Sequence, residues 1–406
     1  MLTDRGRWVL GLGGLTYLAG WAFGSDPLYP IAIGLVLAVA GAAIWVRLVA
    51  RPMRLRRRLR REFVDGDDVP VELELEFAGR LPALSLVVVE RIARLGTRET
   101  LLRRRGGKLR GRYVLEQVPR GRYAIESAHV VAEDPFALER LEVPLQSGVS
   151  VVVYPRLVEL DRLFSEGGGR LAEGRRLLLR RASGFDLHSV REYAQGESLR
   201  RVHWPSTAHR GQLMVKELED SPRDETAVLL DADAGAVVGT PPHSTFEAQV
   251  RAAGSILESH SRRGRRAALI VNSARREYQP VHSYDGDWLL ALEILAAVEP
   301  DGHVPAATLL ADEVGPAARA LELTVVTSAL SARLVERLLQ RTLSRHSATL
   351  VYVDPASFAA GAAPTSRDAL AQILRLRRGG VPVAVLRLGD DLGDKLGSEP
   401  IGAHAG

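Results

Sequence analysis

The order of hydrophobic and polar residues divides the chain into three regions, and the first is uniformly apolar. Two uncharged runs, Trp8–Phe23 and Pro30–Val46, lie close to the N-terminus, and neither shows the polar stripe of an amphipathic helix. Each has 16 or 17 residues, the lower limit for a helix that crosses a hydrocarbon core of ~30 Å. We therefore expect a transmembrane helical hairpin rather than a cleaved signal peptide or two core helices.

In the second region, from about Glu62 to Tyr154, apolar and polar residues alternate. The run Val69–Phe77 reads VPVELELEF, which is typical of a strand with one buried face. Further runs of this kind follow, separated by glycine and proline, and predict a small antiparallel β-sandwich. Asp134 precedes Pro135 and reads as a turn-forming residue.

The third region begins at Thr226 and alternates short Val- and Leu-rich runs with longer helical ones. This pattern predicts an α/β doubly wound domain with a mostly parallel sheet. In such sheets ligands bind at the carboxyl ends of the strands. The last residues, rich in glycine and acids, read as a disordered tail.

The chain is therefore expected to be multidomain, with five segments. These are residues 1–61, the two transmembrane helices with an Arg-rich juxtamembrane segment; 62–155, the β-sandwich; 156–222, a linker with the central motif; 223–390, the α/β domain; and 391–406, the tail.

Composition changes this picture in two ways. The absence of cysteine excludes disulfides, thiolate metal sites and cysteine nucleophiles. The net charge of +5 arises from one stretch, Arg47 to Arg61, which holds eight arginines and no acid, so that the other 391 residues sum to about −3. Nucleic-acid binding is therefore not expected.

The position of this stretch, directly after the second apolar run, predicts a membrane anchor on the cytoplasmic side. Arg5 and Arg7 flank the first run, whereas the connecting turn holds only Asp26. By the positive-inside rule both termini and the main domains are expected in the cytoplasm, with a multi-pass location in the cell membrane. The predicted anchor residues are Arg47, Arg51, Arg54, Arg56, Arg57, Arg58, Arg60 and Arg61.

The central stretch from Leu177 to Asp220 is the most distinctive part of the sequence. It is dense in arginine, histidine, aromatic residues and glycine, but shows no nucleophile–base spacing and no H-E-x-x-H or H-x-H set. The order SGFDL, REYAQGESLRRVHW, AHRGQLMVKE resembles the signature of the domain of unknown function 58 family. The matching positions are Gly184, Phe185, Arg191, Tyr193, Gly196, Arg200, Arg201, Trp204, Ala208, Gly211, Leu213, Val215, Lys216 and Glu217.

Three positions depart from the family pattern. Glu197 stands where aspartate is usual, His203 where aspartate or asparagine is usual, and His209-Arg210 where the family has Ala-Arg directly. The resemblance implies a von Willebrand factor A-like domain after the motif, in agreement with the α/β pattern. It also implies an N-terminal membrane hairpin and a β-rich segment before the motif.

An A-like domain with a working metal site has D-x-S-x-S after its first strand, whose oxygens suit Mg²⁺. Here the corresponding residues are Asp231, Ala232, Asp233, Ala234 and Gly235, and the later strand ends in Thr327-Ser328 without an aspartate. Asp231 and Asp233 are therefore candidates either for a degenerate magnesium site or for helix capping and pairing with arginine. No other cofactor is expected.

The function expected from the resemblance is that of a membrane-anchored, non-enzymatic interaction or scaffold protein. Its implied partners are a MoxR-type AAA+ ATPase and a transglutaminase-like membrane protein, in a cell-envelope or complex-assembly role. Two alternatives stay open, a degenerate Mg²⁺-dependent ligand-binding A-like domain and an unrecognised hydrolase. Against the hydrolase stands the lack of a P-loop, a G-x-S-x-G sequence or paired acids.

Overall fold

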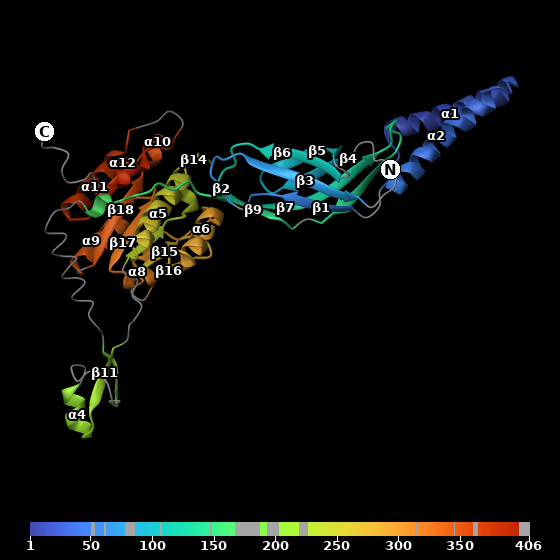
Figure 1. Ribbon diagram of the computed structural model, residues 1–406. Helices are drawn as coiled ribbons and strands as arrows, with labels where there is room; N and C mark the ends of the chain where they lie inside the picture. The colour runs from blue at the N-terminus through green and yellow to red at the C-terminus, as the bar shows by residue number, and fades with distance from the viewer. Residues whose placement is uncertain are drawn as a thin grey trace, which may run out of the picture. The chain divides into compact units, whose positions relative to one another are not determined.

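The computed structural model consists of two compact units, Met1–Tyr154 and Pro155–Gly406, which are described separately (Figure 1). The structure describes residues 1–49, 53–60, 62–77, 86–105, 108–146, 148–166, 187–192, 203–218, 226–312, 315–344, 346–359 and 364–397.

The first unit begins with two packed helices, α1 (Asp4–Phe23) and α2 (Leu28–Val49) (Figure 1). Glycines allow the close approach, since a Cβ on Gly13 or Gly20 lies in contact with side chains of α2. Leu28–Leu48 is long and apolar enough to cross a membrane by length and composition, with a mean hydropathy of 2.2 and 22% of the window buried. The N-terminal part thus contains a helix able to serve as a membrane anchor.

The rest of the first unit is a nine-stranded sheet that is antiparallel except between β2 and β9. Its order is β1-β3-β6-β5-β4-β7-β9-β2, and β8 pairs with β7. The strands are β1 (Met53–Arg58), β2 (Phe63–Val64), β3 (Val69–Phe77), β4 (Leu86–Ile92), β5 (Gly96–Arg105), β6 (Lys108–Leu115), β7 (Gly121–Glu133), β8 (Arg140–Leu145) and β9 (Ser150–Tyr154).

A buried ion pair shows that this sheet folds back on itself. Arg57 of β1 donates from Nε to Glu90 Oε1 of β4 at 2.6 Å, although β1 and β4 lie four strands apart, ~19 Å in a flat sheet. Both side chains are buried, at 4% and 0% exposure. Tyr113 of β6 donates to the other Glu90 oxygen at 2.7 Å. Burial, and then the Glu90 carboxylate, raise the pKa of Tyr113 far above its ordinary value, so its hydroxyl stays a donor.

The structure places four residues of the predicted arginine anchor in a strand, and one of them, Arg57, is buried and cannot face a membrane surface. Arg54, Arg56, Arg57 and Arg58 lie in β1, paired in register with the Glu-rich strand β3, so the β region begins at Met53 rather than at residue 62. The stretch looks acid-free because its partners Glu76, Glu74 and Glu90 come from other strands. Arg51 and Arg61 lie outside the described residues, while Arg47 lies in the last turn of α2 and Arg60 is exposed.

The second unit contains a six-stranded sheet of order β16-β15-β12-β17-β18-β19, parallel except for the edge strand β16. In chain order this is 3-2-1-4-5-6, the order of doubly wound sheets. The strands are β12 (Thr226–Leu230), β15 (Ala267–Val271), β16 (Glu277–Val281), β17 (Glu322–Thr327), β18 (Ser347–Val353) and β19 (Val383–Leu386). The predicted doubly wound sheet is thus present.

Helices cover both faces of this sheet, each over its own apolar cluster. One cluster joins α5 (Thr245–Arg262), α6 (Asp287–Ala297) and α12 (Leu392–Leu396) to residues such as Val228 and Leu230. The other joins α7 (Ala306–Leu309), α8 (Pro316–Arg319), α9 (Ala332–Leu343) and α11 (Arg367–Arg378) to Leu229 and Val325. Because successive residues of β12 face opposite clusters, both of its faces are buried. The short helix α10 (Pro355–Phe358) follows β18.

The predicted disordered tail is wrong for its first residues. Asp391 caps α12 by accepting the Asp394 N–H at 3.1 Å, and Leu396 is fully buried in the core beneath α5. Gly397 forms a β-bridge with Leu163. The segment is ordered because Leu392 and Leu396 recur at the helical spacing of four residues, a signal that the surrounding glycines and acids obscure. Residues 398–406 lie outside the described part of the chain.

Glu90→Gln tests the closure of the first sheet. Removing the carboxylate leaves the Arg57 charge buried without its partner, which we expect to cost ~3–5 kcal/mol of local stability. Hydrogen-exchange mass spectrometry of peptides from β3 to β7 in the full-length protein measures the local stability of the first unit separately from that of the second. The matched control is Glu76→Gln, whose exposed pair with Arg56 is worth under ~1 kcal/mol. Equal exchange rates in both variants would contradict the assignment.

Candidate functional site

The carboxyl ends of the parallel strands bring together a buried polar cluster around Asp231, the residue after β12. Its Oδ1 accepts from Asn272 Nδ2 at 2.9 Å, and its Oδ2 accepts from the Thr327 hydroxyl at 2.7 Å. Asn272 follows β15 and Thr327 ends β17, so the three side chains come from adjacent strands. This is the switch point of the sheet, where ligands of doubly wound folds bind.

The electrostatics of the cluster are set by burial. Asp231 is 3% exposed. Burial raises its pKa above the usual value, the hydrogen bonds from Thr327 and Asn272 oppose this, and the nearby Asp233 carboxylate adds to it. Next to it, Ser328 accepts from Gln249 of α5 at 3.0 Å and donates to the Ala236 carbonyl at 2.9 Å. The cluster thus holds two carboxylates and two hydroxyl groups at one edge.

Asp233 has a structural contact of its own, because it caps the short 3-10 helix Ala234–Ala236 and accepts the Gly235 N–H at 2.9 Å. The described residues contain no group of three or more His, Asp or Glu side chains that could hold a metal ion. The oxygens of Asp231, Asp233, Thr327 and Ser328 are of the type that Mg²⁺ prefers, although each carboxylate already accepts hydrogen bonds from the protein. A magnesium site at Asp231 and Asp233 therefore stays a prediction.

The signature residues that the structure describes lie in a separate hairpin. Strand β10 (Leu187–Glu192) pairs antiparallel with β11 (Met214–Leu218), which places Arg191 opposite Val215 and the Ser189 backbone opposite Glu217. Lys216 lies opposite Val190. Between the strands in the chain lies α4 (Trp204–Arg210), which is capped by His203, whose ring accepts the Ser206 N–H at 3.3 Å.

Gly211 shows why one signature position is a glycine. It ends α4 with φ at +70°, in the left-handed region, and donates its N–H to the Thr207 carbonyl at 2.9 Å. After this turn the N–H of Met214, the first residue of β11, donates to the Thr207 hydroxyl at 3.0 Å. Trp204 and Leu213 stay exposed, at 66% and 41%.

The structure thus brings part of the predicted signature together on one hairpin, and the rest is not described. The signature positions outside the described residues are Gly184, Phe185, Tyr193, Gly196, Arg200 and Arg201.

A short strap, Pro155–Glu166, holds the chain just before this segment against α5. Val158 N–H donates to Ser255 at 3.0 Å, and Ser259 donates to the Leu160 carbonyl at 2.8 Å. Leu157 covers Gly254, where a Cβ would meet the leucine side chain at 2.6 Å. Successive residues of the strap contact successive residues of α5, so the strap runs parallel to the helix towards its C-terminal end.

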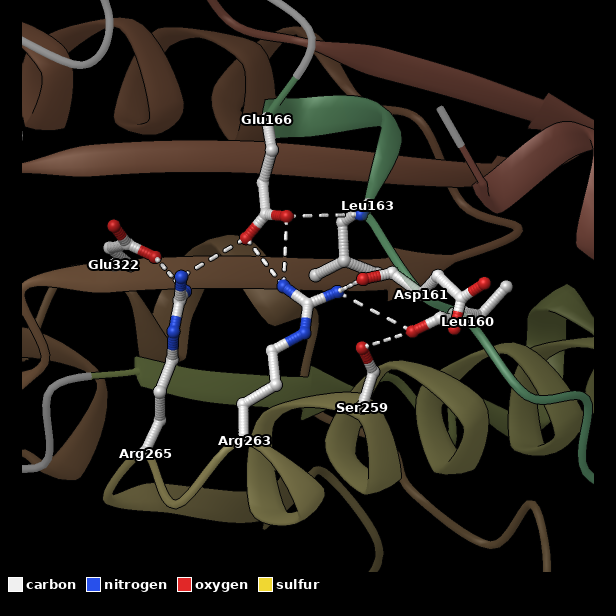
Figure 2. Close-up of polar contacts among 8 residues, drawn as sticks. All are labelled: Leu160, Asp161, Leu163, Glu166, Ser259, Arg263, Arg265 and Glu322. Atoms are coloured by element: carbon white, nitrogen blue, oxygen red, sulfur yellow. Dashed lines mark hydrogen bonds and ion pairs between the residues drawn. The ribbon is translucent and has the colours of Figure 1, made fainter. Parts of the chain in front are cut away.

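The strap ends in a carboxylate clamp, shown in Figure 2. Both Glu166 oxygens accept from Arg263 Nη1, at 2.9 and 2.8 Å, and one also pairs with Arg265 at 3.2 Å. Arg265 in turn lies 3.6 Å from Glu322, and Arg263 also donates to the Asp161 carbonyl. Burial raises the pKa of Glu166, but the bonds from Arg263, the Leu163 N–H and the Arg265 charge outweigh it, so the pKa is lowered overall.

The residues before and after the signature segment, Glu166 and Thr226, both lie at the amino edge of the sheet. Arg265 and Arg266 directly precede β15, and Glu322 begins β17. Thr226, the first residue of β12, donates its N–H to the Arg266 carbonyl at 3.1 Å. Both stems, Glu166 and Thr226, therefore contact the same Arg263–Arg266 turn, at the edge opposite Asp231.

Sequence reasoning missed the partners in both clusters. Asn272 ends the run RAALIVN, and the rule that ligand-binding residues follow parallel strands was sufficient to suggest it. Glu166, Arg263 and Arg265 carry no local signal, because their pairing depends on segments 97 or more residues apart.

Comparison with known proteins agrees with the signature. Residues 189–359 match the family described as "Protein of unknown function DUF58". The predicted resemblance to the DUF58 family is thus confirmed over this region. The match begins at Ser189 in β10, runs through the hairpin and the first five strands of the α/β unit, and ends after α10.

A curated relative, the uncharacterized protein YeaD of Bacillus subtilis, is 26% identical over 220 residues, which is 54% of this chain. The match spans about half, 53%, of that relative's length. Two solved structures are more remote. A CARDB domain from Pyrococcus furiosus, in complex with di-metal ions, is 11% identical over 25% of this chain and 87% of its own, with a TM-score of 0.18. A conjugative transposon lipoprotein from Bacteroides eggerthii is 16% identical, over 25% and 96%, with a TM-score of 0.15. Neither supports an argument about fold or function.

Glu166→Gln tests the clamp. We expect it to lower the free energy of unfolding at pH 7 by ~1–3 kcal/mol, since Arg263 and Arg265 lose their shared carboxylate. Because the pKa of Glu166 is lowered in the folded state, its contribution is present above ~pH 4.3 and disappears as the pH falls through the folded value. The difference between the two proteins should therefore shrink in acid.

The measurement is hydrogen exchange of the strap and α5 peptides at several pH values. Glu159→Gln is the matched control, because Glu159 lies on the same strap but is 70% exposed and pairs with the exposed Arg262. A pH-independent difference, or an equal effect in the control, would argue against the clamp.

Proposed function

We propose that this chain is a membrane-anchored, non-enzymatic protein-interaction module, and that the β10–α4–β11 hairpin is its docking surface. The observation that carries the proposal is the exposure of Trp204 and Leu213 on a capped hairpin, in the middle of the family signature. A large exposed aromatic residue is costly to leave in water and is typical of the energetic centre of an interface.

The neighbourhood of Trp204 fits the same role. His209, Arg210 and Gln212, in the same helix or the turn after it, are also exposed, so the surface of this hairpin combines an aromatic residue with polar and basic ones. The clamp is compatible with this role, because Glu166 and Thr226, which precede and follow the signature segment in the chain, both contact the turn after α5.

The partner that the family resemblance implies is a MoxR-type AAA+ ATPase, together with a transglutaminase-like membrane protein, in a cell-envelope or complex-assembly role. We also infer that the α/β unit is von Willebrand factor A-like. Its 3-2-1-4-5-6 strand order with an antiparallel strand at the edge supports this. The folding of the first sheet back on itself likewise supports a β-sandwich.

Trp204→Ala tests the docking surface. Full-length protein in detergent is used to capture a MoxR-type ATPase under ATP, ADP and nucleotide-free conditions. We expect capture by the wild-type chain in at least one nucleotide state, and at least a tenfold loss of affinity in the variant, as for an aromatic hot spot. Leu343→Ala, which truncates an 84% exposed residue of α9, is the control and should bind normally. Recovery of the wild-type chain alone in all three conditions would contradict the proposal.

The anchor is proposed to be a two-helix hairpin with both ends in the cytoplasm. Exposed apolar side chains surround α1 as well as α2, among them Trp8, Leu15, Trp21, Ile33 and Leu37. At 20 residues α1 spans ~30 Å. The edge-on contact of Tyr17 with Tyr29, with ring centres 5.3 Å apart, joins the two helices near the turn. Arg5, Arg7 and Arg47 lie together at the opposite end of the pair.

Single cysteines test this topology cleanly because the chain has none of its own. We expect Ser25→Cys, in the turn, to react with a membrane-impermeant maleimide in intact cells. Leu343→Cys, exposed on α9, should react only after the membrane is opened. Protection of both residues in intact cells would contradict a spanning hairpin, and the reverse pattern would invert the orientation.

A further inference from the structure

The outer face of strands β1, β3, β6 and β5 carries rows of opposite charges. In one row Arg58 lies opposite Glu72, which lies opposite Arg112. In the next, Arg56 lies opposite Glu74, followed by Arg110 and Arg103. Glu72 and Glu74 of β3 therefore each lie between arginines of the two neighbouring strands.

The two ends of strand β5 pair with different neighbours, and this opens a crevice. Arg103 to Arg105 pair with β6, whereas Gly96 to Leu102 pair with β4. Beyond the Arg103–Arg110 pair, β5 and β6 therefore diverge. Gly111 lies at this point of divergence, where a Cβ would meet Thr100 at 2.7 Å. The crevice has a volume of about 500 Å³, with Leu73 and Leu101 among its lining residues.

The charges that line the crevice do not cancel. Four arginines, Arg58, Arg103, Arg110 and Arg112, meet two glutamates. Glu74 is already shared by Lys108, Arg58 and Arg110, with both arginines at 3.6 Å, and the Lys108 contact in particular lowers its pKa. Among the described residues, Arg103 and Arg112 have no ion-pair partner. Their exposed guanidinium groups therefore stay available to an outside anion.

We propose that this crevice binds a soluble anion with at least two phosphate charges, of the pyrophosphate type. Guanidinium groups form paired hydrogen bonds with phosphate oxygens. A surplus of two arginines matches a ligand of two or more charges. Arg58 lies five residues, ~17 Å of strand, beyond Met53, where β1 begins after α2. This distance from the membrane helix favours a soluble ligand over a lipid headgroup.

The test is calorimetric titration of pyrophosphate into the full-length protein in nanodiscs of neutral lipid. We expect binding by the wild-type chain and at least a tenfold weaker affinity in Arg103→Gln/Arg112→Gln. The lysine pair Arg103→Lys/Arg112→Lys should be intermediate, since it keeps the charge but loses the paired geometry. Arg60→Gln/Arg104→Gln removes the same charge from exposed residues outside the crevice and should stay within twofold of wild type.

Several results would overturn the proposal. No heat from the wild-type chain at millimolar pyrophosphate would do so, as would an equal loss in the control pair. Equal affinity for an oligoglutamate peptide would indicate a site for acidic peptides instead. Nanodiscs of anionic lipid distinguish the two phosphate sources. A soluble ligand should bind equally well in them, whereas strong competition would assign the crevice to lipid headgroups.

Discussion

The Glu166 carboxylate fixes the chain just before the segment that bears the family signature. Through Arg263 and Arg265 it fastens the strap to the end of α5, and through Glu322 it reaches the start of β17. The first strand, β12, starts from the same turn through Thr226. An excursion of the chain between residues 166 and 226 therefore has both ends fixed at one point. If the strap were loose, the distance between residues 166 and 226 would no longer be fixed.

The first unit uses a similar device in a different setting. Arg57 and Glu90 come from strands far apart in the sheet order, and their burial requires the sheet to close. The same strand, β1, begins four residues after α2 ends, and Trp45 and Val46 of α2 pack against the core of the sheet. The ion pair holds β1 in the closed sheet, and the apolar contacts at the end of α2 attach this helix to the same core. Motion of α2 relative to the sheet would have to break these apolar contacts.

The sequence alone predicted the elements whose signals are local. Strand β3 has the bounds of the alternating run Val69–Phe77, and Asp134 forms a turn, accepting the N–H groups of Phe136, Leu138 and Glu139. Prediction from the sequence failed for residues whose hydrogen-bond, ion-pair or strand partners lie far away in the chain. Eight arginines after an apolar run are typical of a membrane stop, and only the register with β3 shows that four belong to a strand. Asp231 was found, but Asn272, Thr327 and the clamp depend on which strands are neighbours.

The two edges of the α/β sheet differ in chemistry, and this bears on how the domain works. At the carboxyl edge, Asp231 is buried and both of its oxygens accept hydrogen bonds from protein side chains. A ligand binding there has to displace contacts that already exist. The segment whose two ends lie at the amino edge instead contains the exposed Trp204. Binding to an exposed hairpin costs no internal hydrogen bond. This difference supports the hairpin, rather than the Asp231 cluster, as the proposed docking surface, and the hydrogen bonds of Asp231 stabilise the switch point of the sheet.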